Sequence, residues 1–384
     1  MELLGIILIY IISQLETFFK LGNFGTISKL LGYAILFIFV LRILIRKKIS
    51  IPRESYFLMA FIVLGLASAL WAYYPNTALG RSFTLIQLFL LYTITFNMFK
   101  NNNSKLARNF YKIIIFFGAA LSLYIVFQVI ISSSITQWSR ISISDQVDVN
   151  HLASFLIPSF LFGLYYSINK TEKYLIPTMT VLVAILLTQS RGAFVSISIP
   201  IVIYLLIIFK TTKKQGLKYK QVFLAVAGLC IVFIIIPKEF LYRINLMLQS
   251  KEILLRGSGR NVIWGNAWNE FTNSPIVGIG LGNFTALYRP PHSSLFQILS
   301  ELGIIGVFVM ALFLVMLFFD HRRKKINGID FEFIVAIALL LMSLTVDIFY
   351  QKYLWIMIGV CSSVKYSKIV SSYNEKEAES LTNQ

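Results

Sequence analysis

The chain has few charged residues for its length. Asp, Glu, Lys and Arg make up 14% of its 384 residues, against roughly 25% in a typical soluble domain. A hydrophobic content of 57% excludes an intrinsically disordered chain, which needs low hydrophobicity. It also argues against a soluble nucleic-acid-binding protein, which carries a dense basic face on an ordinary core, so we expect no nucleic-acid partner. The composition predicts an all-α polytopic membrane protein.

Cysteine is also scarce. The two cysteines, Cys230 and Cys361, both lie inside apolar runs, which indicates neither a disulfide framework nor a CxxC metal site. The glycines of 278–282 (GIGLG) lack the GxGxxG spacing and follow no βα unit, so we do not expect a nucleotide loop. They favour a tight turn with positive φ or a close helix contact. We expect no metal and no cofactor.

Long apolar runs dominate what is present. Each run is close to the roughly 20 residues that one helix needs to cross a bilayer. The first starts at Leu3, includes Glu16 and has no cleavage site after it, so it indicates a membrane span rather than a cleaved signal. About twelve spans are predicted: 3–19, 27–46, 55–72, 79–99, 110–134, 149–168, 174–190, 193–209, 221–237, 296–319, 329–350 and 353–366.

The distribution of positive charge predicts the orientation. The chain has 35 Lys and Arg against 17 Asp and Glu, a formal net charge of +18. With the N-terminus inside, 22 of these 35 lie in the cytoplasmic loops and tail. The positive-inside rule therefore predicts N-in and C-in. Residues 1–366 then form the bundle, and residues 367–384 form a polar cytoplasmic tail.

One connection is much longer than the others. Residues 238–295 form an external loop between the ninth and tenth spans, and long loops of this kind are usually functional or disordered. This one holds Trp264, Trp268 and Phe271, so we expect it to fold. The pattern over 261–271 predicts a short amphipathic helix.

Three arginines are predicted on the external side. Arg81 begins the fourth span, Arg191 separates two spans with almost no loop, and Arg260 lies in the long loop. Ionisable groups at such positions are functional candidates, and a guanidinium offers a planar fork for phosphate oxygens. The alternative is that they are interfacial or loop arginines.

His292 is the candidate acid–base group. It follows Pro290 and Pro291 at the entry to the tenth span, and a histidine accepts a proton near neutral pH. His151 is treated as structural, and His321 belongs to a basic cytoplasmic cluster. Possible supporting residues are Asp148, Asn150, Glu301 and Trp264. For Glu301 the alternative is a buried polar group bonded to another helix.

Several segments together resemble one family. They are RGSGRNVIWGNAWNEFTNSPIVGIGLGNF, HSSLFQILSELGIIG, TQSRGAF, DVNHLASF and LWAYYPNTALGRSF. As a set, over most of residues 65–310, they resemble the O-antigen ligase and O-antigen polymerase family. The chain departs from the family pattern after His292, where Ser293 and Ser294 stand in place of the Asn that commonly follows the histidine.

The resemblance implies a bacterial membrane glycosyltransferase of the C-type fold. It implies a donor glycan on undecaprenyl pyrophosphate and a glycan or lipid acceptor. The site would face outward from the cytoplasmic (inner) membrane, and other polysaccharide-assembly proteins are possible partners. By matching motif, Arg191 and Arg260 would bind the pyrophosphate, Arg81 would assist, and His292 would orient or deprotonate the acceptor hydroxyl. The reaction would be independent of metal and nucleotide.

Other functions stay open at this point. Twelve spans also suit a lipid-linked oligosaccharide flippase or another transporter, although carriers place their charges at the membrane midplane in broken helices. A receptor or structural subunit has no positive signal. Polymerase and ligase differ only in the acceptor, and we lean slightly towards a polymerase, or surface-polysaccharide assembly in the broad sense.

Overall fold

The computed structural model describes residues 2–13, 49–100, 104–131, 147–212, 260–319, 331–364 and 366. The predicted spans 27–46 and 221–237, the loop before residue 260 and the tail 367–384 lie outside this part. Every regular element within the described ranges is helical. The all-α prediction is therefore confirmed for these residues.

The helices follow the apolar runs closely. Their bounds are α1 (Glu2–Ile12), α3 (Ser55–Ala67), α4 (Pro75–Phe99), α5 (Ser104–Ile131), α6 (Val149–Asn169), α7 (Leu175–Leu187), α8 (Arg191–Thr212), α12 (Arg260–Asn273), α13 (Asn283–Leu287), α14 (Ser294–Phe319) and α15 (Phe331–Ser343), with the 3₁₀ turns η2 (Ser68–Leu70) and η4 (Glu172–Tyr174). A C-terminal helix runs from Lys352 to Val364. The short helix expected over 261–271 is present as α12.

Four described helices are long and apolar enough to cross a membrane. They are Pro75–Phe99, Leu106–Ile131, Val149–Asn169 and Ser294–Phe318. Five shorter apolar helices accompany them: Leu3–Ile12, Ser55–Leu70, Arg191–Leu206, Phe331–Ser343 and Lys352–Val364. By length and composition, the described helices are those of a multi-pass membrane protein.

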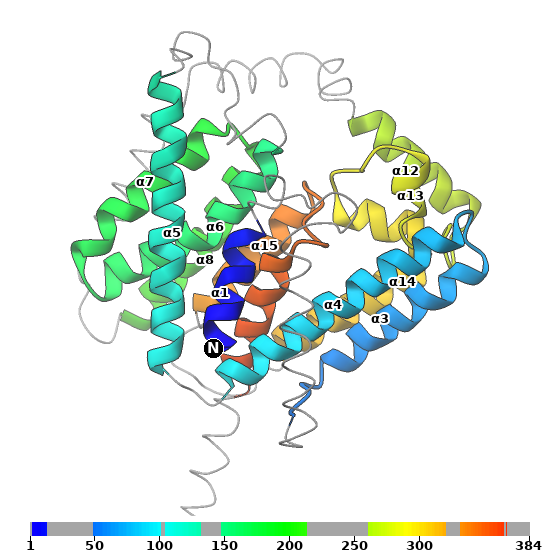
Figure 1. Ribbon diagram of the computed structural model, residues 1–384, viewed down its shortest axis with the longest axis horizontal. Helices are drawn as coiled ribbons and strands as arrows, with labels where there is room; N and C mark the ends of the chain where they lie inside the picture. The colour runs from blue at the N-terminus through cyan, green and yellow to red at the C-terminus, as the bar shows by residue number, and fades with distance from the viewer. Residues whose placement is uncertain are drawn as a thin grey trace, which may run out of the picture.

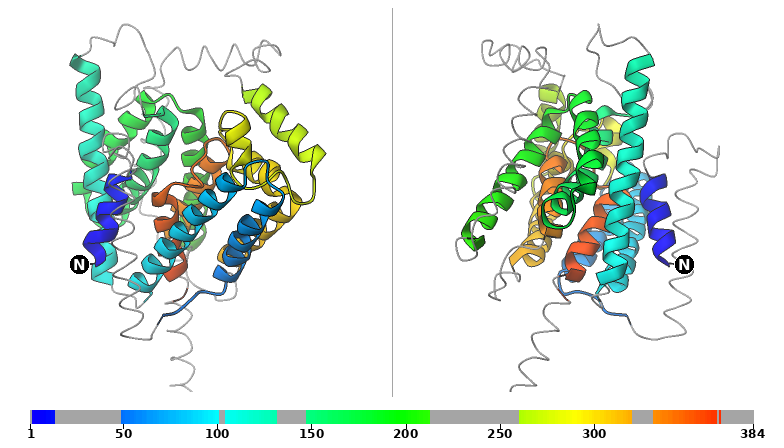
Figure 2. Two further views of the ribbon diagram at one scale, coloured as in Figure 1. Left: turned by 45° about the vertical axis from the view of Figure 1, so that its right-hand side comes forward. Right: turned by 90° about the vertical axis from the view of Figure 1, so that its left-hand side faces the viewer.

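The described helices form two groups. One contains α1, α5, α6, α7, α8 and α15, and the other contains α3, α4, α12, α13 and α14 (Figure 1). The C-terminal helix joins them, because Tyr353 packs on Phe155 of α6 at 5.6 Å between ring centroids and Trp355 packs on Phe313 of α14 at 6.2 Å. In the left-hand view of Figure 2, α12, α13 and α14 again lie on the side away from α1 and α5.

The span predicted at 329–350 is wrong in its second half. Helix α15 ends at Ser343, and the chain is not helical again until Lys352. In the intervening segment the carboxylate of Asp347 accepts the backbone N–H of His292, and the carbonyl of Phe349 accepts Nε1 of Trp355. A helix through this stretch would use these backbone groups internally and would turn the carboxylate away from its partner.

Helix α14 is broken at Gly303, where φ is 62° and ψ is −159°. The loop 275–282 takes over the hydrogen bonds that the break removes. Ile279 and Gly280 donate to the carbonyls of Ser300 and Glu301, at 3.1 and 2.9 Å. In return, residues 304 and 305 donate to the carbonyls of residues 275 and 276. The break is tolerated inside an apolar bundle because its backbone groups find these partners.

The glycines of 278–282 serve this contact. Gly278, Gly280 and Gly282 all have positive φ, which favours residues without a Cβ. A Cβ on Gly278 would lie 2.4 Å from the carbonyl carbon of Glu301, and one on Gly282 would lie 2.4 Å from Cγ of Arg81. The expectation of positive φ and close approach is confirmed.

The substitution Gly303→Ala should destabilise the protein. The backbone conformation of Gly303 is essentially restricted to glycine and costs a residue with a Cβ about 1–3 kcal/mol. The new methyl group would also lie 2.4 Å from the carbonyl oxygen of Ile276. We expect a lower apparent unfolding temperature in nanodiscs, followed by tryptophan fluorescence. Gly80→Ala is the control: it lies in α4 with open space around it and should stabilise by about 0.5–1 kcal/mol. Equal shifts for the two variants would contradict the assigned role.

Candidate functional site

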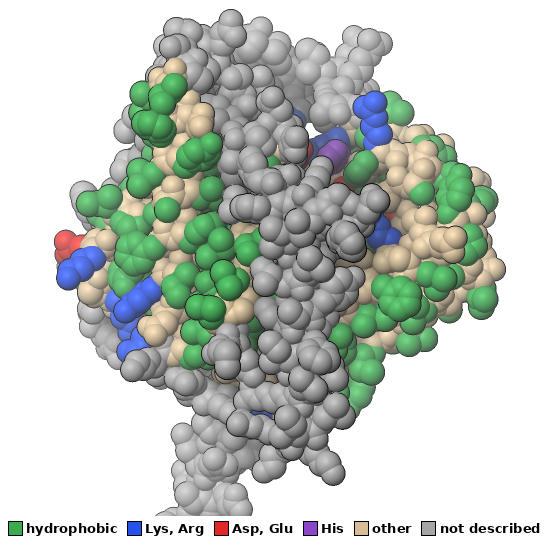
Figure 3. Space-filling model, viewed as in Figure 1, with side chains coloured by type: hydrophobic (Ala, Val, Ile, Leu, Met, Phe, Trp, Pro, Cys, Tyr) green, Lys and Arg blue, Asp and Glu red, His purple; other side chains and the backbone are tan. Residues whose placement is uncertain are grey.

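Three of the main site residues lie where helices begin. Asp148 is the N-cap of α6, Arg191 is the first residue of α8 and His292 lies two residues before α14, whereas Arg260 is the first described residue of α12. Helix N-termini carry partial positive charge and bind anions readily. In the space-filling view, a histidine and Lys or Arg side chains lie together in a hollow at the upper centre (Figure 3).

Arg260 is the electrostatic centre of this group. It interacts with Arg191, Asp148 and Asp347. Burial lowers the pKa of its guanidinium below the ordinary value, and the like charge of Arg191 lowers it further, while the two carboxylates act in the opposite direction. An arginine still stays protonated near neutral pH. Two guanidinium groups and two carboxylates therefore share this site.

His292 is held in a strained conformation. Its φ of 50° places it in the left-handed region, which is uncommon for a residue with a side chain. Its amide donates to Oδ2 of Asp347 at 3.0 Å, and Nε1 of Trp264 donates to the carbonyl of Pro291 at 2.8 Å. The Trp264 ring also stacks on Phe296, with centroids 5.0 Å apart. Contacts on both sides thus fix the backbone that carries the imidazole.

Arg191 is positioned by a polar contact between α6 and α8. The hydroxyl of Ser190 donates to Oδ1 of Asn150 at 3.0 Å. Gln189 is the second non-glycine residue with positive φ among the described residues, at 50°. Sparsely populated conformations of this kind concentrate at functional sites. Asn150 therefore contacts the residue that precedes Arg191.

Asp148 caps α6 and faces the same site. Its Oδ1 accepts the amides of Asn150 and His151 at 2.7 and 3.2 Å. Burial alone would raise the pKa of Asp148, but these amides together with His151 and His292 outweigh burial and leave the pKa below its ordinary value. The carboxylate is therefore charged near neutral pH and partly balances the arginines.

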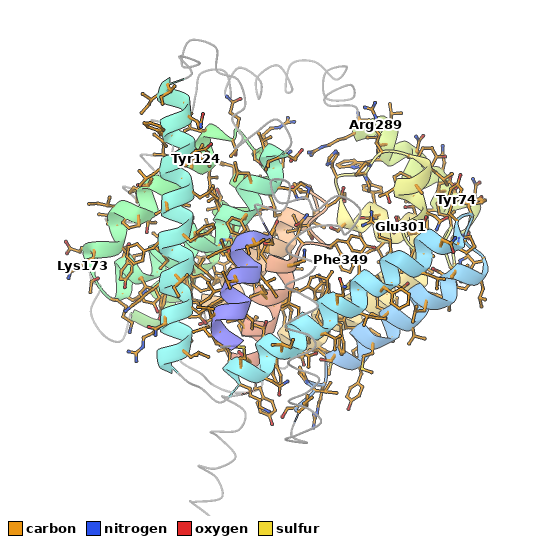
Figure 4. The ribbon with its side chains drawn as sticks, in the orientation of Figure 1. Tyr74, Tyr124, Lys173, Arg289, Glu301 and Phe349 are labelled. Atoms are coloured by element: carbon orange, nitrogen blue, oxygen red, sulfur yellow. The ribbon has the colours of Figure 1, made fainter. Side chains whose placement is uncertain are left out.

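Arg81 and Glu301 form a neighbouring cluster. The Arg81 guanidinium lies 4.8 Å from the centre of the Tyr350 ring and interacts with Glu301. Glu301 is buried and accepts hydrogen bonds from the Gly282 amide and from Gln297, the latter at 3.3 Å. Figure 4 shows Glu301 inside the second group of helices, below α12 and α13. Asp347 connects this cluster to the group around Arg260, because it interacts with both Glu301 and Arg260.

Two residues at the site were not among the sequence candidates. Asp347 interacts with His292, His151 and Arg260, but it was predicted inside an apolar span. A carboxylate in an apolar run is itself a signal of function, and that signal was available in the stretch 344–350. His151, which the sequence treated as structural, interacts electrostatically with Asp148, Asp347 and His292.

The site joins paired guanidinium groups with histidines and carboxylates. Such a set can hold a diphosphate and accept a proton from a hydroxyl group. Within the ranges that the structure describes, no group of three or more His, Cys, Asp or Glu residues could hold a metal ion. The independence from metal stays a prediction.

The substitution Trp264→Phe should loosen the segment that carries His292. Phenylalanine keeps the stacking on Phe296 but loses the hydrogen bond to Pro291, which is worth about 1 kcal/mol. We expect amide hydrogen exchange of the peptide 288–296, measured by mass spectrometry, to become about fivefold faster. Trp268→Phe, on the exposed face of the same helix, should leave the exchange unchanged. Equal exchange in both variants would remove the positioning role of Trp264.

One comparison with known proteins bears directly on the site. Residues 176–311 match the family model described as O-Antigen ligase. The matched segment is less than half of the chain and contains Arg191, Arg260, His292 and Glu301. No curated protein matches the chain. The match supports the resemblance to the O-antigen ligase and polymerase family over residues 176–311.

Proposed function

We propose that the protein transfers a glycan from undecaprenyl pyrophosphate to a hydroxyl group of a glycan or lipid acceptor, at the outer face of the cytoplasmic membrane. The observation that carries the proposal is that Arg260 interacts with Arg191 and shares Asp148 and Asp347 with His292, in a chain whose residues 176–311 match the O-Antigen ligase family model. The coarser conclusion, a glycosyltransferase-like enzyme of surface polysaccharide assembly, follows from the family match.

The reaction is a substitution at the anomeric carbon of the donor sugar. The acceptor oxygen forms a bond to this carbon while the bond from the carbon to the pyrophosphate oxygen breaks. The bonding electron pair leaves with the pyrophosphate, and the acceptor proton passes to His292. The lipid-linked bond supplies the driving force, so neither a nucleotide nor a metal is assigned a role.

Arg191 and Arg260 act on the leaving group. Negative charge grows on the pyrophosphate oxygen as the bond breaks, and preorganised donors aimed at such charge are the usual way in which enzymes stabilise it. The partial positive charge at the start of α8 adds to the guanidinium charges. Arg81 assists from the neighbouring cluster, with Glu301 and Tyr350 beside it.

His292 acts as the general base, and Asp347 positions it. The Asp347 carboxylate holds the backbone amides of His292 and Ser293. It also lies close enough to interact with the imidazole, so it stabilises the positive charge that the ring gains with the proton. Trp264 fixes Pro291, the residue before His292. Asn150 supports Arg191 through Ser190, and Asp148 interacts with Arg260.

The finer topology belongs to the same proposal. Twelve spans with both termini inside place the long loop 238–295 outside and the tail 367–384 in the cytoplasm. The site then faces outward, where a lipid-linked donor and other polysaccharide-assembly proteins would meet it. Positive-inside loops support this orientation.

A transporter is the second candidate. The break in α14 near the buried Glu301 favours it, because carriers build substrate sites at discontinuous helices. The loop 275–282 fills this break with backbone hydrogen bonds, however. The charged groups gather at helix ends instead, which favours the enzyme.

The substitutions Arg191→Ala and Arg260→Ala should each lower glycan transfer by about 100-fold or more, the usual effect of removing one donor to a developing negative charge. The measurement is the amount of elongated or attached surface glycan at equal protein level. Arg53→Ala removes one exposed positive charge elsewhere and should have no effect. Normal glycan in both site variants would refute the pyrophosphate role.

The substitution His292→Ala should stop turnover without stopping donor binding. General-base catalysis contributes about 100-fold or more, whereas the arginines that hold the donor remain. Binding of undecaprenyl pyrophosphate to the purified variant should equal that of the wild type, and glycan transfer should be lost. Unchanged transfer would exclude His292 as the base.

The orientation predicts where an added cysteine reacts. In a chain without Cys230 and Cys361, a membrane-impermeant thiol reagent added to intact cells should label Arg260→Cys. The same reagent should not reach Lys214→Cys, which the positive-inside rule places in a cytoplasmic loop. Labelling of the second variant alone would invert the topology.

A further inference from the structure

Four buried side-chain atoms at the site have no hydrogen-bond partner. They are Nδ1 of His151, Nδ1 of His292, Oγ of Ser294 and Oδ1 of Asp347. Ser294 is only 5% exposed. A buried polar atom without a partner costs about 1–3 kcal/mol, and native proteins keep few of them.

These atoms belong to one place in the fold. His151 lies in the first turn of α6 and interacts with His292 and Asp347. Ser294 begins α14, two residues after His292, and Asp347 accepts the amides of His292 and Ser293. Two of the unpartnered atoms therefore belong to residues that interact with His292, the base of the proposed mechanism, and a third belongs to Ser294, two residues further along the chain.

The chemistry of this set selects a neutral ligand. Oδ1 of Asp347 only accepts hydrogen bonds while ionised, so it repels a phosphate and requires a donor. The hydroxyl of Ser294 and the two imidazoles each donate or accept, according to rotamer and tautomer. A sugar hydroxyl donates one hydrogen bond and accepts others, which matches both kinds of atom. In the proposed site, Arg191 and Arg260 bind the anionic pyrophosphate, whereas the unpartnered atoms bind hydroxyl groups.

We propose that His151, with Ser294 and the free oxygen of Asp347, binds a second hydroxyl of the acceptor sugar beside the hydroxyl that His292 receives. The acceptor is then a sugar with at least two hydroxyl groups in reach of the site. This inference rests on the proposed function. It makes His151 a residue of acceptor binding, distinct from the base and from the pyrophosphate clamp.

The proposal has a consequence for water. When the acceptor is poorly held, water can take its place with the donor still on the arginines. The water oxygen then bonds to the anomeric carbon, its proton passes to His292, and the pyrophosphate leaves with the bonding electron pair. Free glycan is released instead of transferred glycan. The ratio of transferred to released glycan therefore reports acceptor binding, and it does not depend on the amount of folded protein.

Full-length variants are expressed in the native strain from which the chromosomal gene has been deleted. The membranes of this strain supply the donor and the acceptor. Transferred, released and lipid-linked glycans are measured in one extract. We expect His151→Ala to lower the ratio of transferred to released glycan by about tenfold, the loss of one hydrogen bond. His151→Asn, whose amide reaches the place of Nδ1, should restore most of the ratio. Ser122→Ala is the matched control, because Ser122 Oγ is also buried and unpartnered but lies in α5.

The outcomes separate the two proposals. A wild-type ratio in His151→Ala overturns the acceptor role. A parallel loss of transferred and released glycan at normal protein level also overturns it, because a donor-side or purely structural residue would give that result. A ratio that falls in Ser122→Ala as well would mean that any unpartnered buried group has this effect. Normal transfer in Arg191→Ala would instead refute the proposed function.

Discussion

An apolar helix bundle can hold a charge or an interrupted backbone only where other groups satisfy it, and the site depends on this constraint. The Asp347 carboxylate sits in a non-helical segment and accepts the amide of His292. The break in α14 is filled by the loop 275–282. Each irregular segment thus supplies hydrogen-bond partners to another segment that is distant in sequence. The candidate site residues lie near these segments.

The sequence was sufficient to predict most of the described apolar helices, and it named Arg191, Arg260 and Asp148, which the structure brings together. Arg191 interrupts an apolar run and His292 follows two prolines, and such interruptions mark helix ends. Asp347 was missed because hydropathy measures the length of an apolar run and not the continuity of its backbone. The break at Gly303 was missed for the same reason, since it depends on hydrogen bonds from a loop more than twenty residues earlier.

Arg81 illustrates the limit of reasoning by residue type. Three external arginines were predicted to act on one anion, and Arg260 does interact with Arg191. Arg81 instead lies over Tyr350 and beside Glu301, so its charge is partly used within the protein. Sequence position gives the end of the bundle at which a charge lies, whereas its partners depend on packing between helices.

The glycines of 278–282, which belong to the segments that resemble the family, have a structural role. They lie against the backbone of Glu301 and the side chain of Arg81 and repair a broken helix. The most recognisable part of the pattern is therefore a requirement of folding in lipid. Under the proposed function, these glycines maintain the backbone, so sugar specificity should be sought in residues outside this loop.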